Sequence, residues 1–212
     1  MTESLAARDY NGVTIPTAGT YVLDANHKRV GFVARHLMVS KVRGEFLTAE
    51  ATITIAEDPL QSSVTATIQT ASITTENDRR DTHLRSPDFF AADSFPTITF
   101  KSSKIVPGPN NSALVYGDLT IRGITKPVTL EANYLGSMAN ARMGGKIAGF
   151  DAKTTIDRKD FNVLWNRVLD QGGTMLGDDV AIELQVEASW TDPNAPARPQ
   201  APPPTPPPGE KK

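Results

Sequence analysis

The chain has 212 residues, a net charge of −2 at neutral pH and a charged fraction of 22%. This balance lacks the strong basic excess of a general nucleic-acid-binding protein, and we expect no nucleic-acid partner. The sequence contains no cysteine, which excludes disulfides, thiolate metal sites and cysteine nucleophiles. No segment approaches the roughly 20 apolar residues of a membrane-spanning helix, so we expect a protein that does not span a membrane.

The first 17 residues form a segment of mixed polarity. It contains Glu3, Arg8 and Asp9 but no long apolar run. A secretory signal needs a basic start and an apolar stretch of about 7–15 residues. We therefore expect a cytoplasmic protein in which residues 1–17 form an extended arm ahead of the folded domain.

Apolar and polar side chains alternate over much of residues 18–192. This period of two places one set of side chains on each face of a β-strand. One face of the first long strand is formed by Val30, Phe32, Ala34, His36 and Met38. Further strands follow over residues 47–55, 64–73 and 97–105. The pattern changes phase near Gln69, which predicts a β-bulge or a strand end there.

Residues 115–132 predict an antiparallel hairpin. The apolar positions of its two strands are Val115, Leu119, Ile121, Val128 and Leu130. Gly123 suits the corner, because glycine readily adopts a positive φ. Pro127 has no N–H to donate, which the first position of a strand tolerates, so we expect the second strand to begin there.

Two more strands, over residues 141–157 and 180–190, complete the pattern. Residues 76–92 predict one or two short helical turns. Residues 157–178 form a long connection, for which a short helix and a loop that covers one barrel end are the alternatives. The strands together predict an all-β fold, an eight-stranded antiparallel barrel over residues 18–192 with one or two short helical segments in its connections. Closure would remove exposed strand edges.

Residues 193–212 form a Pro-rich tail that contains PPPTPPP. Proline fixes φ and lacks an N–H, so the tail favours solvated polyproline II. It has no apolar residues able to build a core, and we expect it to be disordered. A spacer role and docking on the aromatic-lined groove of a partner remain as alternatives.

Several short motifs occur in an order that is similar to one known family. They are Asp24 with His27, Phe32 with His36, Arg80-Asp81-Thr82-His83-Leu84, Asp88-Phe89-Phe90, the stretch from Phe95 to Phe100, the hairpin, Arg158-Lys159-Asp160-Phe161 and Gly177-Asp178-Asp179. No single motif is decisive, but the ordered set over residues 20–190 is specific. The chain resembles the YceI-like, polyisoprenoid-binding family.

The resemblance implies a lipocalin-like barrel with an elongated apolar cavity that binds a polyisoprenoid or a similar lipid. Two features depart from the family pattern. Members are often exported, whereas this sequence shows no secretory signal. Asn162 follows Phe161 where glycine is common, which implies a reshaped loop.

Burial of each CH₂-sized group of an isoprenoid gains about 0.8 kcal/mol, so an apolar wall is the main requirement of such a site. The lipid-binding residues that we expect are Phe32, Ala34, His36, Met38, Phe100, Leu119, Ile121, Val128, Leu130, Phe161, Trp165, Ile182, Leu184 and Val186. An ordinary packed core would use the same residue types, and the sequence does not separate a hollow barrel from a filled one. We expect no cofactor apart from a bound isoprenoid or quinone-like lipid.

Two polar residues are candidates for binding a lipid head group. The imidazole of His36 shares the inward face and can bond a head group or titrate near neutral pH, with a satisfied core histidine as the alternative. Arg158 is the candidate cation for a phosphate at the barrel mouth. His27 and His83 are expected to hold corners together, and no metal site is expected.

Catalytic motifs are not visible. The three histidines lack the H-E-x-x-H spacing, and no G-x-S-x-G elbow occurs. We therefore expect no enzyme activity. The function predicted is non-catalytic binding, transport or sequestration of a long-chain lipid, by a homodimer. The alternative is a protein-interaction scaffold that works through the Pro-rich tail and has a filled barrel core.

Overall fold

The computed structural model describes residues 7–37, 39–139, 145–170 and 172–191. The strands are β1 Ala7–Tyr10, β2 Val13–Pro16, β3 Gly19–His36, β4 Ser40–Phe46, β5 Ala49–Ile55, β6 Ser63–Gln69, β7 Ile73–Thr74, β8 Thr97–Pro107, β9 Ser112–Ile121, β10 Ile124–Ala139, β11 Lys146–Asp157 and β12 Leu176–Thr191. The helical elements are η1 Pro59–Gln61, η2 Thr70–Ser72, α1 Asp78–Arg85 and η3 Arg158–Phe161. None of these described helices has the length and hydropathy that crossing a membrane requires.

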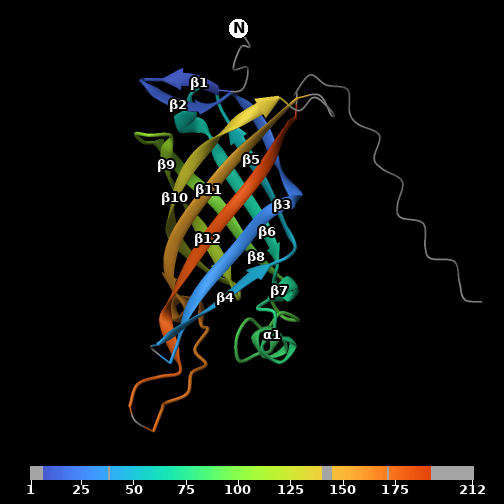
Figure 1. Cartoon of the computed structure of the whole chain (residues 1–212), viewed down its shortest axis with the longest axis vertical. Helices are drawn as coiled ribbons and strands as arrows, with labels where there is room; N and C mark the ends of the chain where they lie inside the picture. The colour runs from blue at the N-terminus through green and yellow to red at the C-terminus, as the bar shows by residue number, and fades with distance from the viewer. Residues whose placement is uncertain (1–6, 38, 140–144, 171, 192–212) are drawn as a thin grey trace, which may run out of the picture.

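Eight strands form a closed antiparallel barrel (Figure 1). They pair in the order β12, β11, β10, β9, β8, β6, β5 and β3, and β12 closes the ring by pairing with β3. β4 pairs with the second half of β3, and the short β7 pairs antiparallel with the last residues of β4. This arrangement confirms the predicted eight-stranded antiparallel barrel with short helical segments in its connections.

The N-terminal strands lie outside this ring. β1 and β2 pair with each other as a separate antiparallel hairpin. Figure 1 shows this hairpin at one end of the barrel and α1 at the other. The two ends of the barrel are therefore covered by different elements, and "hairpin end" and "α1 end" name them below.

Alternation explains why the strands form where they do. In β9, Val115, Leu119 and Ile121 are buried, whereas Tyr116 and Asp118 between them are exposed. Such a strand is stable only with its apolar face turned to an interior. The phase change in the third predicted strand proves to be a strand end, since β6 stops and η2 begins there.

A tight turn joins β9 to β10. Its two residues, Arg122 and Gly123, have φ of 52° and 72°, as a hairpin turn that follows the twist of the strands requires. β10 begins directly after it, at Ile124, and Pro127 lies inside the strand opposite Asp118. The expectation that Pro127 starts the strand is wrong, because a two-residue turn is enough to reverse the chain.

Two groups of buried side chains pack in different parts of the barrel. The larger group includes Phe46, Ile98, Phe100 and Phe161. The smaller group consists of Tyr21, Tyr134, Ala148 and Ala188, with Phe150 and Trp190 packed against it. Burial raises the pKa of Tyr21 to about 12. Because Ala7 and Ile55 also pack on the smaller group, it lies at the hairpin end.

A buried carboxylate holds α1 against the barrel. Asp81 is only 3% exposed; it accepts hydrogen bonds from the Thr75 N–H (2.9 Å), the Thr75 hydroxyl and the Thr74 hydroxyl (3.1 Å). Burial alone would raise the pKa of Asp81, but these hydrogen bonds lower it overall. The Asn77 side chain caps the helix by accepting from the Arg80 N–H at 3.0 Å. Asp81 and the cap at Asn77 thus fix this segment of the chain.

The close approach of Phe100 to Gly117 gives a stability prediction. A Cβ on Gly117 would lie 2.5 Å from Phe100 Cζ and 2.6 Å from the Lys101 carbonyl oxygen. We expect Gly117→Ala to lower the free energy of unfolding by about 1–3 kcal/mol through overpacking, measured by denaturant titration. Gly149→Ala is the control, because its nearest neighbour would be 3.5 Å away. Equal losses in the two variants would contradict the prediction.

Candidate functional site

A cavity of about 840 Å³ lies inside the barrel. This volume falls within the range of about 300–1,000 Å³ that is usual for small-molecule sites. All of the barrel strands contribute inward-facing side chains to its wall, and most of these side chains are apolar. The arrangement can therefore bury an apolar molecule of considerable length.

Small side chains explain why space remains in the barrel. Alanines line the cavity on five different strands: Ala34, Ala51, Ala66, Ala132 and Ala152. Each reaches only one carbon into the interior. Larger neighbours such as Phe32 and Ile182 face inward yet are only partly buried. The barrel is hollow, which resolves a question that the sequence left open.

The predicted wall residues that the structure describes all border this cavity. They are Phe32, Ala34, His36, Phe100, Leu119, Ile121, Val128, Leu130, Phe161, Trp165, Ile182, Leu184 and Val186. Met38, also predicted, lies outside the described residues. The structure thus brings the set together around one space, while lipid binding by its members remains a prediction.

Polar and cationic side chains border the cavity at the α1 end. His36 at the end of β3 and Asn77, Arg79 and Arg80 at the start of α1 all belong to the wall. Arg80 donates through Nε to the Thr75 hydroxyl at 2.7 Å. Within the described part of the chain, the side chains of His36 and Arg79 have no hydrogen-bond or ion-pair partner. They can therefore meet a polar group of a ligand.

Sequence reasoning missed Arg79 as a candidate site residue. Its neighbours Arg80 and Asp81 belong to a recognisable motif, but Arg79 on its own shows no spacing or pattern. The predicted N-terminus of the helix was the only available signal, since it would have placed Arg79 in the first turn. Its position at the cavity follows from the way in which Asp81 fixes α1.

Arg158 also borders the cavity, but its guanidinium holds the long connection. It is buried and donates to the carbonyl oxygens of Gly177 (2.9 Å), Val163 (2.6 Å) and Trp165 (3.0 Å). It also pairs with Asp178 at 3.1 Å, rather than with the neighbouring Asp160. These contacts engage the guanidinium that would otherwise bind a head group. The head-group role of Arg158 stays a prediction.

An aromatic cluster joins α1 to the long connection. The ring of His83 lies 5.0 Å from that of Phe89 and 4.9 Å from that of Trp165, both edge-on. His83 Nε2 also lies 2.9 Å from an Asp88 carboxylate oxygen. His83 thus holds a corner, as expected from the sequence, and the cluster shapes the cavity wall at the α1 end.

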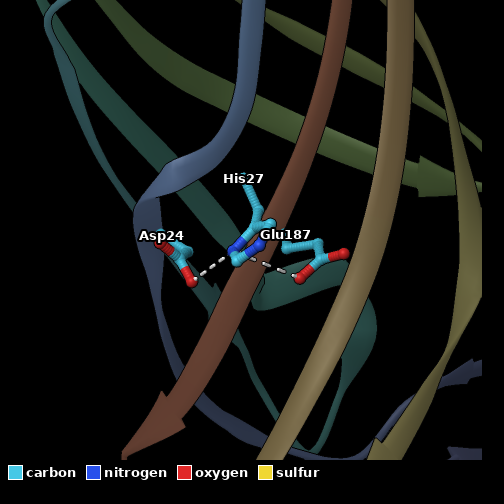
Figure 2. Close-up of side chains that lie close together, drawn as sticks. All are labelled: Asp24, His27 and Glu187. Atoms are coloured by element: carbon cyan, nitrogen blue, oxygen red, sulfur yellow. Dashed lines mark hydrogen bonds and ion pairs between the residues drawn. The ribbon is translucent and has the colours of Figure 1, made fainter.

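A second polar group consists of Asp24, His27 and Glu187 (Figure 2), which are exposed or half-buried and do not border the cavity. His27 Nδ1 lies 3.0 Å from Asp24 Oδ2 and 3.9 Å from Glu187 Oε2. The three side chains offer donor atoms within 4.8 Å of one another, a spacing that a metal ion can bridge. Their direct contacts are those of an ion pair that fixes residues 24–27, which are inserted in β3 opposite Glu187.

The fold and its interior define a class of protein: a closed antiparallel β-barrel with an internal apolar cavity, as in lipocalins. Residues 21–188 match the model of the YceI-like domain. The chain therefore belongs to the YceI-like family, as its sequence motifs indicate.

Relatives and solved structures agree with this assignment. A UPF0312 protein of Staphylococcus aureus (strain bovine RF122 / ET3-1) is 38% identical over 176 residues, which cover 81% of this chain and 98% of the relative. The Campylobacter jejuni YCEI protein has a TM-score of 0.64 at 31% identity and covers 74% of this chain and 90% of its own. Burkholderia cenocepacia BcnA has a TM-score of 0.67 at 26% identity and covers 78% and 98%.

One further structure shares the fold alone. It is a polyisoprenoid binding domain from Saccharophagus degradans implicated in plant cell wall breakdown, with a TM-score of 0.62 at 11% identity. It covers 82% of this chain and is itself covered completely. At this identity the likeness establishes the barrel architecture, not a shared ligand.

The ion pair of Asp24 and His27 gives a pH prediction. A hydrogen bond with Asp24 raises the pKa of His27 and lowers the pKa of Asp24. Because the pKa of His27 is raised in the folded state, its protonated form stabilises the fold at pH values below its unfolded pKa, near 6.5. Because the pKa of Asp24 is lowered, its ionised form stabilises the fold at pH values above its unfolded pKa, near 3.9. Both contributions are therefore present between about pH 4 and 6.5.

We expect Asp24→Asn to lower the pKa of His27, measured by NMR titration of the imidazole. The loss of stability relative to the wild type should be greatest inside that pH window. Asparagine can keep the hydrogen bond that the Asp24 side chain accepts from the Asn26 N–H at 2.8 Å, so the turn is preserved. An identical pKa of His27 in both proteins would contradict the assignment.

Proposed function

We propose that the protein binds a polyisoprenoid or a similar long-chain lipid, without catalysis, and carries or sequesters it in the barrel. The observation that carries this proposal is the 840 Å³ cavity with a mostly apolar wall. Membership of the YceI-like family supports it, as does the fold shared with a polyisoprenoid binding domain.

The middle of the cavity suits an apolar chain. Its wall there is built from aliphatic and aromatic side chains such as Val64, Phe100, Leu130 and Ile182. Each CH₂-sized group moved from water into such surroundings contributes about 0.8 kcal/mol. Several isoprene units can thus drive binding without hydrogen bonds, and a polar ligand would leave its own polar groups unpaired.

The α1 end suits the head of such a lipid. Arg79 is exposed at the rim of the cavity, and His36 offers a second polar group. A guanidinium binds oxygen-rich anions through charge-assisted hydrogen bonds. The ligand proposed is therefore amphipathic, with its chain inside the barrel and an anionic or oxygen-bearing head at Arg79.

The remaining expectations stay predictions. These are the cytoplasmic location, the transport role, the homodimer and the absence of a cofactor. The Pro-rich tail lies outside the described residues, so no observation favours the scaffold alternative that depends on it.

The first experiment is to extract purified protein with organic solvent and identify the bound molecules by mass spectrometry, together with the native mass of the complex. A stoichiometric isoprenoid, quinone or fatty chain is the expected result. Protein that is empty and takes up no added isoprenoid would count against the proposal.

A blocking variant tests whether the cavity is the binding site. Ala66 borders the cavity, whereas its neighbour Thr65 is exposed on the outer face of β6. We expect Ala66→Trp to weaken binding of geranylgeraniol at least about tenfold, because the indole occupies the space of several CH₂ groups. Thr65→Trp is the matched control and should bind like the wild type. Equal affinities of the two variants, measured by calorimetry, would place the site elsewhere.

A charge variant tests the head-group site. Arg79→Ala should weaken binding of farnesyl diphosphate by roughly 10–100-fold, as expected for loss of a hydrogen bond to a charged group. Its affinity for farnesol should change little. Arg29→Ala serves as the control, because Arg29 is exposed and does not border the cavity. A similar loss for the alcohol and the diphosphate would argue against a charge-specific role of Arg79.

A further inference from the structure

The β1–β2 hairpin lies outside the part of the chain that matches the family model. The match begins at residue 21, whereas the hairpin spans residues 7–16. Figure 1 shows it at the end of the barrel opposite α1, and β2 contacts β10 there. Membership of the family therefore assigns no role to the hairpin. A role for the hairpin has to be inferred from its contacts with the barrel.

The inner surface of the hairpin is part of the cavity wall. Ile15 is only 7% exposed and Pro16 is buried, and both border the cavity together with Thr14. In the other strand of the hairpin, Ala7 packs against the buried cluster around Tyr21. The hairpin thus presents apolar surface to the interior at the end of the cavity that is remote from Arg79.

One arginine of β1 ties the hairpin to the barrel. Arg8 donates to the carbonyl oxygens of Glu57 (2.7 Å), Ala56 and Pro16 (3.4 Å). It also pairs with the Glu57 carboxylate at 3.0 Å. Glu57 and Ala56 follow β5 directly, so these contacts fasten the hairpin across the barrel end.

The base of the hairpin is held by two aromatic side chains of the barrel, the buried Tyr21 and the partly buried Trp190. The Tyr21 hydroxyl donates to the Thr17 carbonyl oxygen at 2.8 Å, and Trp190 Nε1 donates to the Ala18 carbonyl oxygen at 3.2 Å. Gly19 has φ of 142°, and a Cβ there would lie 2.0 Å from Trp190 Nε1. The path of the chain into β3 therefore requires glycine and leaves the hairpin little freedom at its base.

We propose that the β1–β2 hairpin is an end cap that sets the maximum length of the ligand. Ile15 and Pro16 form the end wall that the tail of a bound chain meets, and Arg8 is the positioning residue that keeps this wall in place. The inference rests on the proposed function, because it assumes a ligand that enters with its head at the α1 end. A chain longer than the distance from the α1 end to this wall does not fit completely inside the barrel, and the atoms left in water add no affinity.

The test compares the length dependence of binding in wild-type protein and Arg8→Ala. Two ligand series are used, the n-alkyl alcohols from octanol to eicosanol and the isoprenyl alcohols farnesol, geranylgeraniol and solanesol. In wild-type protein we expect affinity to rise with length and then level off or fall. Arg8→Ala should move this limit to longer chains, with a gain of about tenfold or more for the longest and no change for the shortest.

Arg43→Ala is the matched control. Arg43 also pairs with a carboxylate, Glu183 at 3.3 Å, but on the outer wall and away from the cavity. It should keep the wild-type length limit. The same limit in wild-type protein and Arg8→Ala, with both proteins folded, would overturn the end-cap proposal.

A rescue experiment excludes a general loosening of the barrel. The chain has no cysteine, so the double variant Arg8→Cys, Glu57→Cys can be joined selectively by a short bismaleimide. Cross-linking should restore the wild-type limit, and an unchanged extended limit would contradict the role of the anchor. If the n-alkyl limit moves in Arg8→Ala while no isoprenyl alcohol binds either protein, the end cap stands and the proposed isoprenoid function fails.

Discussion

The antiparallel pairing of β12 with β3 is the contact on which the rest of the structure depends. It runs from Leu176 opposite His36 to Thr191 opposite Thr20, with two shifts of register on the way. It turns a sheet with two long open edges into a ring, so the backbone groups of these strands find partners inside the barrel wall. The closed ring also encloses the inward side chains, and without it their surface would face solvent.

Closure of the ring does not by itself make the two ends of the cavity different. The elements that cover the two ends do. At one end Asp81 fixes α1 and so places Arg79 at the rim. At the other end an aromatic cluster and the N-terminal hairpin fill or cover the opening. An apolar interior that is cationic at one mouth and blocked at the other suits an amphipathic chain in one orientation. The long connection, fixed by Arg158, completes the polar end.

The strands and their inward faces could be predicted, because a period of two is a local property of the sequence. Phe32, Ala34 and His36 were placed correctly on one face by counting alone. Whether that face meets packed side chains or empty space depends on residues from all around the ring, such as Ala66 and Ala152. The local pattern of one strand does not show how much of the interior the side chains of all the strands fill together. The hairpin at residues 7–16 was missed for a similar reason, because its stability comes from distant partners rather than from its own alternation.

The partly exposed interior has a consequence for the amount of protein in a cell. Inward side chains that border a cavity contribute less to stability than tightly packed ones, because they lack contacts on one side. A ligand that binds only the folded barrel adds about 2.7 kcal/mol of stability when present at a hundred times its Kd. Since unfolded chains are removed by proteolysis, the proposed lipid would slow the turnover of the barrel that binds it. The level of the barrel would then follow the supply of its ligand without any change in gene expression.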